Sequence, residues 1–170
     1  MTAVSLATFA DMFARTLVTT DHLLTKGSVF AEGQGAAPES ILDWRLYEDM
    51  QPLRFQIMVI CNFTQQWPAR VAGMAVPGDV TDDLDIAGFR TALSASRAWL
   101  AALGPEAFAG RDDIPLTYTI GTGMMLTFPS GQWLTGFATT NLYFHLTTAY
   151  AILRARGVPL GKVDLFAAGL

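Results

Sequence analysis

Three polar residues in the last third of the sequence have the spacing that places side chains on one face of a helix. Asn141, His145 and Thr148 stand at positions i, i+4 and i+7. An imidazole beside an amide and a hydroxyl can bind a polar ligand, exchange a proton or coordinate a metal ion. Burying such groups without partners would cost about 1–3 kcal/mol each, so we expect partners, and Gln56 on an earlier helix is the best candidate.

The candidate pocket therefore comprises Gln56, Asn141, His145 and Thr148, and two interpretations of it are open. In the first, these residues form a hydrogen-bonded network that fixes the register of packed helices. In the second, they line a pocket for a ligand or a metal ion in the core of a helical bundle. No residue of the set is identified as catalytic.

The chain has too few candidate metal ligands at helical spacing for a metal centre. The chain has two histidines, His22 and His145, which fall on the first and last predicted helices. A metal site in a helical bundle needs several histidine or carboxylate ligands at helical spacing. We therefore expect His22 to be a partly exposed helix residue, and we expect neither a metal ion nor another cofactor.

The single cysteine, Cys61, lies in the apolar run IMVICNF without a basic neighbour. Such a thiol keeps a high pKa and is unreactive, and one cysteine cannot form an internal disulfide. A nucleophilic Cys61 with His145 as its base is the less favoured alternative.

Hydrophobic residues at spacings of three and four predict four substantial helices that position these groups. They cover residues 5–26, 52–73, 85–103 and 132–156. Gly27 and Gly73 are predicted to end the first two helices, and Pro68 to kink or break the second. Pro38 is predicted to open a short helix that reaches Trp44.

Between Ile114 and Phe128 the pattern changes to two short apolar runs joined by Gly-Thr-Gly, which is typical of a β-hairpin. Ser130 is predicted to be the N-cap of the last helix, and the chain end is expected to pack through Leu165 and Phe166. These elements predict an all-α protein: one domain over residues 1–170, built as a four-helix bundle with a small β-hairpin before the last helix.

Composition narrows the function classes. The 170 residues include 11 Lys+Arg and 15 Asp+Glu, which gives a net charge of −4 and argues against a nucleic-acid binder. The N-terminus has no positively charged start before Asp11, so it is not a secretory signal, and we expect a cytoplasmic protein.

The stretch from Ile114 to Leu153 contains no charged residue and is long enough to raise the question of a membrane span. Its many threonines, together with Gln132, Asn141 and His145, argue against a span and favour a soluble protein. We expect that protein covers this helix, partly from a second copy, so the chain forms a homodimer. The first and last helices are the expected interface, with Tyr143, Leu146 and Tyr150 facing the partner.

Two segments carry a resemblance to a known family. The run NLYFHLTTAYAILRARGVPLGKVDLF, Asn141 to Phe166, resembles the C-terminal signature of a domain-of-unknown-function family in the DinB/YfiT-like superfamily. The run EDMQPLRFQI, Glu48 to Ile57, looks like that family's second-helix opening. The resemblance implies an up-down-down-up four-helix bundle and frequent dimers.

The better understood branches of that superfamily are thiol-dependent transferases and maleylpyruvate isomerases that use a divalent metal. They hold it with one histidine from the second helix and two from the last, four residues apart. His145 matches one last-helix ligand, Asn141 stands at the other, and Gln56 is the nearest second-helix counterpart. The resemblance therefore implies an incomplete metal triad.

Two functions follow as alternatives. The first is a ligand-binding or structural dimeric bundle with a polar pocket around His145. The second is a metal-independent relative of the transferases and isomerases, with His145 as acid or base and Asn141 and Gln56 as orienting groups. The first is favoured because no acidic residue lies in the stretch that holds His145. A role in DNA damage would rest on the superfamily name alone.

Overall fold

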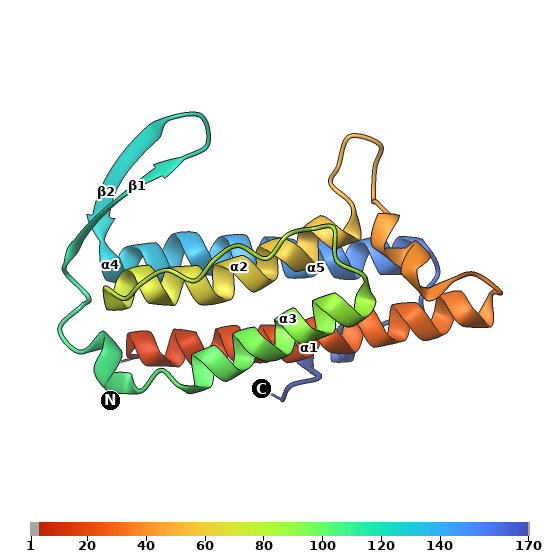
Figure 1. The fold of residues 1–170 in the computed structure, drawn as a ribbon, viewed down its shortest axis with the longest axis horizontal. Coiled ribbons are helices and arrows are strands. Elements are labelled where there is room, and N and C mark those ends of the chain that lie inside the picture. The colour runs from red at the N-terminus through yellow and green to blue at the C-terminus, as the bar shows by residue number, and fades with distance from the viewer. Residues whose placement is uncertain (1–3, 170) are drawn as a thin grey trace.

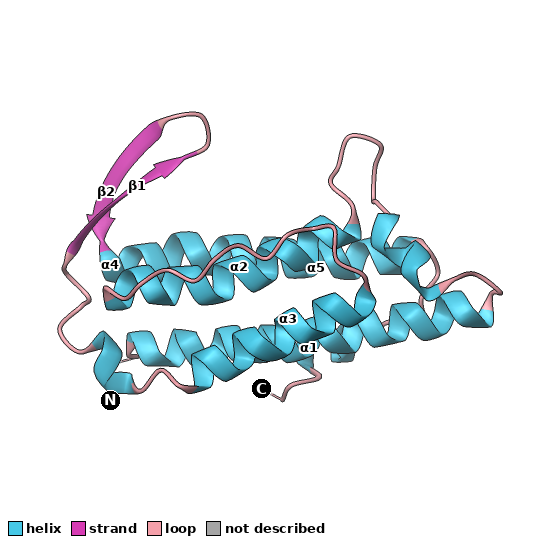
Figure 2. Cartoon of the chain, viewed as in Figure 1, coloured by secondary structure: helices cyan, strands magenta, loops and turns pink. Residues whose placement is uncertain are grey.

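The computed structural model describes residues 4–169 and is mostly helical, with one antiparallel hairpin before the last long helix (Figures 1 and 2). This part of the predicted fold is confirmed. The long helices are α1 (Leu6–Gly33), α2 (Leu53–Ala72), α3 (Ile86–Ala101) and α5 (Thr139–Ala155). The strands are β1 (Pro115–Ile120) and β2 (Met124–Pro129). The short elements are η1 (Pro38–Asp43), η2 (Pro105–Phe108), α4 (Ser130–Gln132), the π-helical η3 (Trp133–Ala138) and η4 (Lys162–Phe166).

The four long helices pack lengthwise around a shared apolar core. In Figure 1 the chain runs from left to right along α1 and α5 and from right to left along α2 and α3, with a long connection between α2 and α3. Helix α1 packs on α3, α2 and α5, and α2 packs on α5 and α3. Each long helix contributes a side chain that is completely buried: Phe13, Ile57, Phe89 and Ile152.

Gly27 does not end α1, which continues to Gly33, so the predicted end of this helix is wrong. Gly27 is buried, and a Cβ atom there would lie 2.8 Å from Cδ2 of Leu153 and 3.1 Å from Cδ1 of Ile41. The missing side chain allows α1 to approach α5 and η1 closely. The glycine therefore serves helix packing rather than helix termination.

Of the kink or break predicted at Pro68, the break is wrong, because α2 is continuous to Ala72. A proline removes one helical hydrogen bond, but Pro68 and its neighbour Trp67 are buried, and tertiary packing outweighs the local cost. The predicted end at Gly73 is confirmed: its φ of 72° is left-handed, a conformation that glycine adopts without strain. Nε of Arg111 donates to the carbonyl of Val71 at 2.8 Å and so satisfies part of this helix end.

Ser130 is the first residue of α4 and does not cap it through its side chain, so the predicted N-cap role is wrong. Its hydroxyl donates instead to the carbonyl of Ile114 at 2.8 Å, which ties the start of the helix to the base of the hairpin. The following π-helical turn, η3, adds a residue per turn, and Oγ1 of Thr139 donates to the carbonyl of Leu134 there at 2.8 Å.

An aromatic cluster fastens the hairpin to the helices. The indole of Trp133 stacks on that of Trp67 at 5.3 Å between ring centroids, and its Nε1 donates to the carbonyl of Leu116 at 2.8 Å. The cluster consists of Trp67, Tyr118, Phe128, Trp133 and Phe137. Because its members come from α2, both strands and η3, the cluster is a tertiary feature.

Within residues 4–169 no helix is both long and apolar enough to cross a membrane. One face of the last helix is buried in the core through Leu142, Leu146 and Ile152. The expectation that Leu146 faces away from the core is wrong, because its exposed fraction is 3%, whereas that of Tyr143 is 40%.

Candidate functional site

His145 and Gln56 form the polar contact between α5 and α2. Nδ1 of His145 lies 2.7 Å from Oε1 of Gln56, so the hydrogen bond expected between these two residues is present. The amide nitrogen of Gln56 donates to the carbonyl of Gln51 at 3.0 Å, and a second carbonyl, that of Pro52, lies at 3.5 Å. Because that amide nitrogen faces acceptors, Oε1 must be the acceptor for His145, and Nδ1 carries the proton.

The other ring nitrogen of His145, Nε2, is not fully buried. No hydrogen bond to Nε2 is formed by any group within residues 4–169, although Nδ1 is bonded. In the same range, the fully buried side-chain atoms without a hydrogen-bond partner are Oδ1 of Asp21 and Oγ of Ser40, so Nε2 keeps some exposed surface. With the proton on Nδ1, Nε2 presents a lone pair that can accept a hydrogen bond.

Burial lowers the pKa of His145 from its ordinary value of 6.5 to about 4. The cause is that the surrounding side chains solvate an imidazolium ion less well than water does. At neutral pH the ring is therefore uncharged. It acts as an oriented acceptor and not as a cation.

Three phenylalanines surround the imidazole. The ring centroids of Phe144, Phe55 and Phe63 lie 5.2, 6.1 and 6.5 Å from that of His145. Phe63 also lies 6.1 Å from Phe137, so the aromatic surface continues into the aromatic cluster. These residues were not predicted to belong to the site, although Phe55 and Phe63 are eight positions apart on α2, a spacing that shares a helix face.

Asn141 and Thr148 are bonded to their own helix. Nδ2 of Asn141 donates to the carbonyl of Phe137 at 2.8 Å, and Oγ1 of Thr148 donates to that of Phe144 at 2.8 Å. Such bonds to the preceding turn are common for short polar side chains in helices. Of the four candidate residues, the structure thus joins Gln56 and His145 directly, while Asn141 and Thr148 find backbone partners.

These residues do not fit the divalent metal that the superfamily resemblance implies. No group of three or more His, Cys, Asp or Glu side chains gathers anywhere in the described range, 4–169. Nδ1 of His145 is used by Gln56, and the amide nitrogen of Asn141 by Phe137, so the site offers one open imidazole nitrogen. A single nitrogen ligand does not make a zinc, nickel or iron site.

Cys61 is completely buried, and burial raises its pKa to about 12. A thiol with this pKa stays protonated at neutral pH and is a poor nucleophile. The geometry therefore gives no support to Cys61 as a nucleophile.

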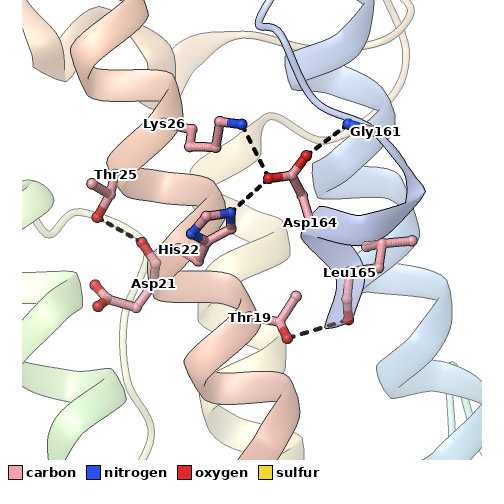
Figure 3. Close-up of polar contacts among 8 residues, drawn as sticks. All are labelled: Thr19, Asp21, His22, Thr25, Lys26, Gly161, Asp164 and Leu165. Carbon is pink, nitrogen blue, oxygen red and sulfur yellow. Dashed lines mark hydrogen bonds and ion pairs between the residues drawn. The ribbon is translucent and has the colours of Figure 1, made fainter. Parts of the chain in front are cut away.

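His22 takes part in a separate contact that holds the end of the chain (Figure 3). Oδ1 of Asp164 lies 2.8 Å from Nε2 of His22 and 3.0 Å from Nζ of Lys26, and the backbone N–H of Gly161 donates to Oδ2 at 2.7 Å. We call Gly161, Asp164, His22 and Lys26 the tail latch. It fixes η4 on α1, whereas the sequence predicted packing of this segment through Leu165 and Phe166. Leu165 does pack on the core, while the exposed fraction of Phe166 is 42%.

The tail latch predicts an acid-sensitive contribution to stability. The Gly161 N–H, followed by His22 and Lys26, holds the pKa of Asp164 far below its ordinary value of 3.8. We expect Asp164→Asn to lower the free energy of unfolding by about 1–3 kcal/mol at pH 7. The pKa of Asp164 is lower in the folded protein than in the unfolded chain. The difference in free energy of unfolding between Asp164→Asn and the parent is therefore complete above pH 4 or so, and it shrinks as the pH falls further.

Urea unfolding of both proteins at pH 7 and pH 3 measures this effect. Asp43→Asn is the matched control, because Asp43 also pairs with a basic side chain, Nε of Arg54 at 3.0 Å, but its side chain is 73% exposed. That change should alter stability by less than about 0.5 kcal/mol. Equal effects of the two substitutions would contradict the role of the tail latch.

Comparison with known proteins agrees with the fold. The chain matches the model of a family described as a domain of unknown function (DUF1993) over residues 7–166. It is similar to the crystal structure of a DinB family member protein from Shewanella denitrificans, with 28% sequence identity and a TM-score of 0.82 over 92% of this chain and 88% of that one. A comparison with curated proteins finds no match. The family resemblance expected from the sequence is confirmed.

Proposed function

This chain belongs to the DUF1993 family of domains with a DinB-like helical fold, and from the geometry around His145 we propose that it is a ligand-binding bundle. The observation that carries the proposal is the Gln56–His145 hydrogen bond, which fixes the tautomer and leaves Nε2 as an accessible acceptor. The ligand donates an O–H or N–H to Nε2.

The surroundings define the rest of the ligand. Phe55, Phe63 and Phe144 place apolar rings with centroids 5.2–6.5 Å from that of the imidazole, and no residue in the stretch from Ile114 to Leu153 carries a charge. An uncharged, flat molecule with one donor group satisfies both the rings and the nitrogen. Such a molecule is a phenol or a small aromatic heterocycle.

Catalysis by His145 in a metal-independent transferase or isomerase is the second function considered. A general base works best when its pKa lies near the working pH. The pKa of His145 is about 4, and its orienting partner is a neutral amide rather than a carboxylate. Both features support ligand binding over proton transfer.

Phenol and anisole test the proposal, since they differ in the O–H donor. In NMR spectra of ¹⁵N-histidine-labelled protein, phenol should shift the Nε2 resonance of His145, and anisole should leave it nearly unchanged. His145→Phe should weaken phenol binding by about five- to tenfold, the loss of one hydrogen bond, and change anisole binding less than about twofold.

His145→Phe leaves the side-chain oxygen of Gln56 without its partner and could therefore destabilise the fold. The double variant Gln56→Leu/His145→Phe avoids this unpaired amide, because both partners of the buried hydrogen bond are replaced by apolar groups. It should show the same loss of preference for phenol. Gln34→Leu is the control, because Gln34 is exposed at the end of α1, and it should bind phenol as the parent does. Equal affinities for phenol and anisole in the parent protein would overturn the proposal.

We further propose that the bundle has up-down-down-up helix order, acts in the cytoplasm and pairs as a homodimer. The directions of the long helices support the first point. The low charge content supports pairing, and Phe144, whose exposed fraction is 58%, is the best candidate for the covered surface of α5. Leu146 is no longer part of that surface. The acidic balance leaves nucleic acid out of the proposed partners.

A further inference from the structure

A cavity of about 290 Å³ lies between α1, α5 and the end of the chain. Its apolar walls come from Met12 of α1, Leu146 of α5, and Leu165 and Phe166 of η4. Leu146 follows His145 directly and therefore lies about 100° away from it around the helix. The cavity is thus separate from the contact between His145 and Gln56.

Among the described residues that line the cavity, Arg15 is the one cationic side chain, and none carries a carboxylate. Arg15 is exposed, and its guanidinium group forms no ion pair or hydrogen bond with any group described between residues 4 and 169. It lies near the phenol of Tyr143, another lining residue: burial raises the pKa of Tyr143, and the charge of Arg15 partly opposes that rise. The net charge of the described lining residues is therefore positive.

The other polar groups of the lining already donate their protons. The hydroxyls of Thr16, Thr19 and Thr147 bond the backbone carbonyls of Phe13, Leu165 and Tyr143. The donors that remain are the guanidinium of Arg15 and the O–H of Tyr143. A ligand head that meets them must be an acceptor and is best negatively charged, and the planar guanidinium matches a carboxylate in particular.

We propose that this cavity binds a small monocarboxylate with an apolar chain. The chain lies against Met12, Leu146 and Phe166, and the carboxylate contacts Arg15 and Tyr143. The volume is at the small end for ligand cavities, which fits a medium-chain acid better than a long one.

The tail latch holds η4, whose residues Leu165 and Phe166 form one wall of this cavity. Figure 3 shows Asp164 held by His22 and Lys26 of α1, with Leu165 next to it in η4. Thr19 connects the two features, because it lines the cavity and donates to the carbonyl of Leu165 at 3.4 Å. Specific contacts between η4 and α1 therefore hold the wall of the cavity in place.

Octanoate and 1-octanol test the proposal, because they share a chain and differ in the charged head. With ¹³C-methyl-labelled methionine, octanoate should shift the Met12 signal, which Met12→Leu identifies. The signals of Met124 and Met125 serve as internal controls, since these residues lie at the start of β2 with exposed fractions of 63% and 70%. Arg15→Gln should weaken octanoate binding about tenfold and change octanol binding less than about twofold.

Arg97→Gln is the matched control, because Arg97 is exposed on α3 and does not line the cavity. It should bind octanoate as the parent does. Equal losses of octanoate and octanol in Arg15→Gln, or an unchanged Met12 signal, would overturn the proposal. The proposal would also be overturned if sedimentation velocity showed a dimer and octanoate did not shift the Met12 signal of that dimer, because a second copy would then fill the cavity. Phenol binding at His145 uses a different probe and signal, so the two proposals fail separately.

Discussion

Replacing Trp133 with alanine should lower the free energy of unfolding by about 3–5 kcal/mol, the range for a large side chain removed from a core. The exposed fraction of Trp133 is 1%, and its ring contacts Trp67, Tyr118, Phe128 and Phe137. The substitution also leaves the carbonyl of Leu116 without the indole N–H at 2.8 Å that it accepts. The hairpin therefore loses its main attachment, and we expect its backbone amides to exchange faster.

Urea unfolding followed by circular dichroism measures the loss, and hydrogen exchange locates it. Trp133→Phe keeps a ring in the aromatic cluster and should cost less, which preserves a folded protein for comparison. Tyr47→Ala is the control, because the exposed fraction of Tyr47 is 69%, and it should change stability by less than about 0.5 kcal/mol. A loss below about 1.5 kcal/mol in Trp133→Ala would show that the cluster does not anchor the hairpin.

Gln56→Glu should raise the pKa of His145 from about 4 to its ordinary value of 6.5 or above. The substitution puts a carboxylate where Oε1 of Gln56 now accepts from Nδ1 at 2.7 Å, and a negative charge at that distance favours the imidazolium ion. In the parent protein the folded pKa is below the unfolded one. The contribution of His145 to the free energy of unfolding is therefore complete above pH 6.5 or so, and it is lost as the pH falls toward 4. The variant should remove that loss.

An NMR titration of the imidazole signal measures the pKa, and His145→Phe identifies that signal because the chain has two histidines. Thermal unfolding at pH 7 and pH 5 measures the change in stability. Gln34→Glu adds the same charge at an exposed position at the end of α1 and should leave the titration unchanged. A pKa that stays near 4 in Gln56→Glu would mean that the Gln56–His145 contact does not form in solution.

Several features were determined by residues that act over a few positions. Gly73 ends α2 and Asp85 caps α3, where its carboxylate accepts from the N–H of Gly88 at 2.7 Å. The turn between β1 and β2 falls at Gly121 and Gly123, both with positive φ. Local spacing also placed His145 on its helix, and the pairing with Gln56 followed from the cost of an unpaired imidazole.

Other features depend on segments that are distant in the chain. The sequence predicts a helix end at Gly27, but in the structure Leu153 and Ile41 occupy the space beside it. The sequence also predicts an exposed Leu146, but this residue is buried next to the cavity between α1, α5 and η4. The proton position on His145 depends on the carbonyl of Gln51, through the amide of Gln56. Asp164 and His22 are 142 residues apart. Propensity and periodicity describe the backbone of one element, whereas burial, tautomer and charge pairing depend on which other elements pack against it, so only the tertiary structure decided them.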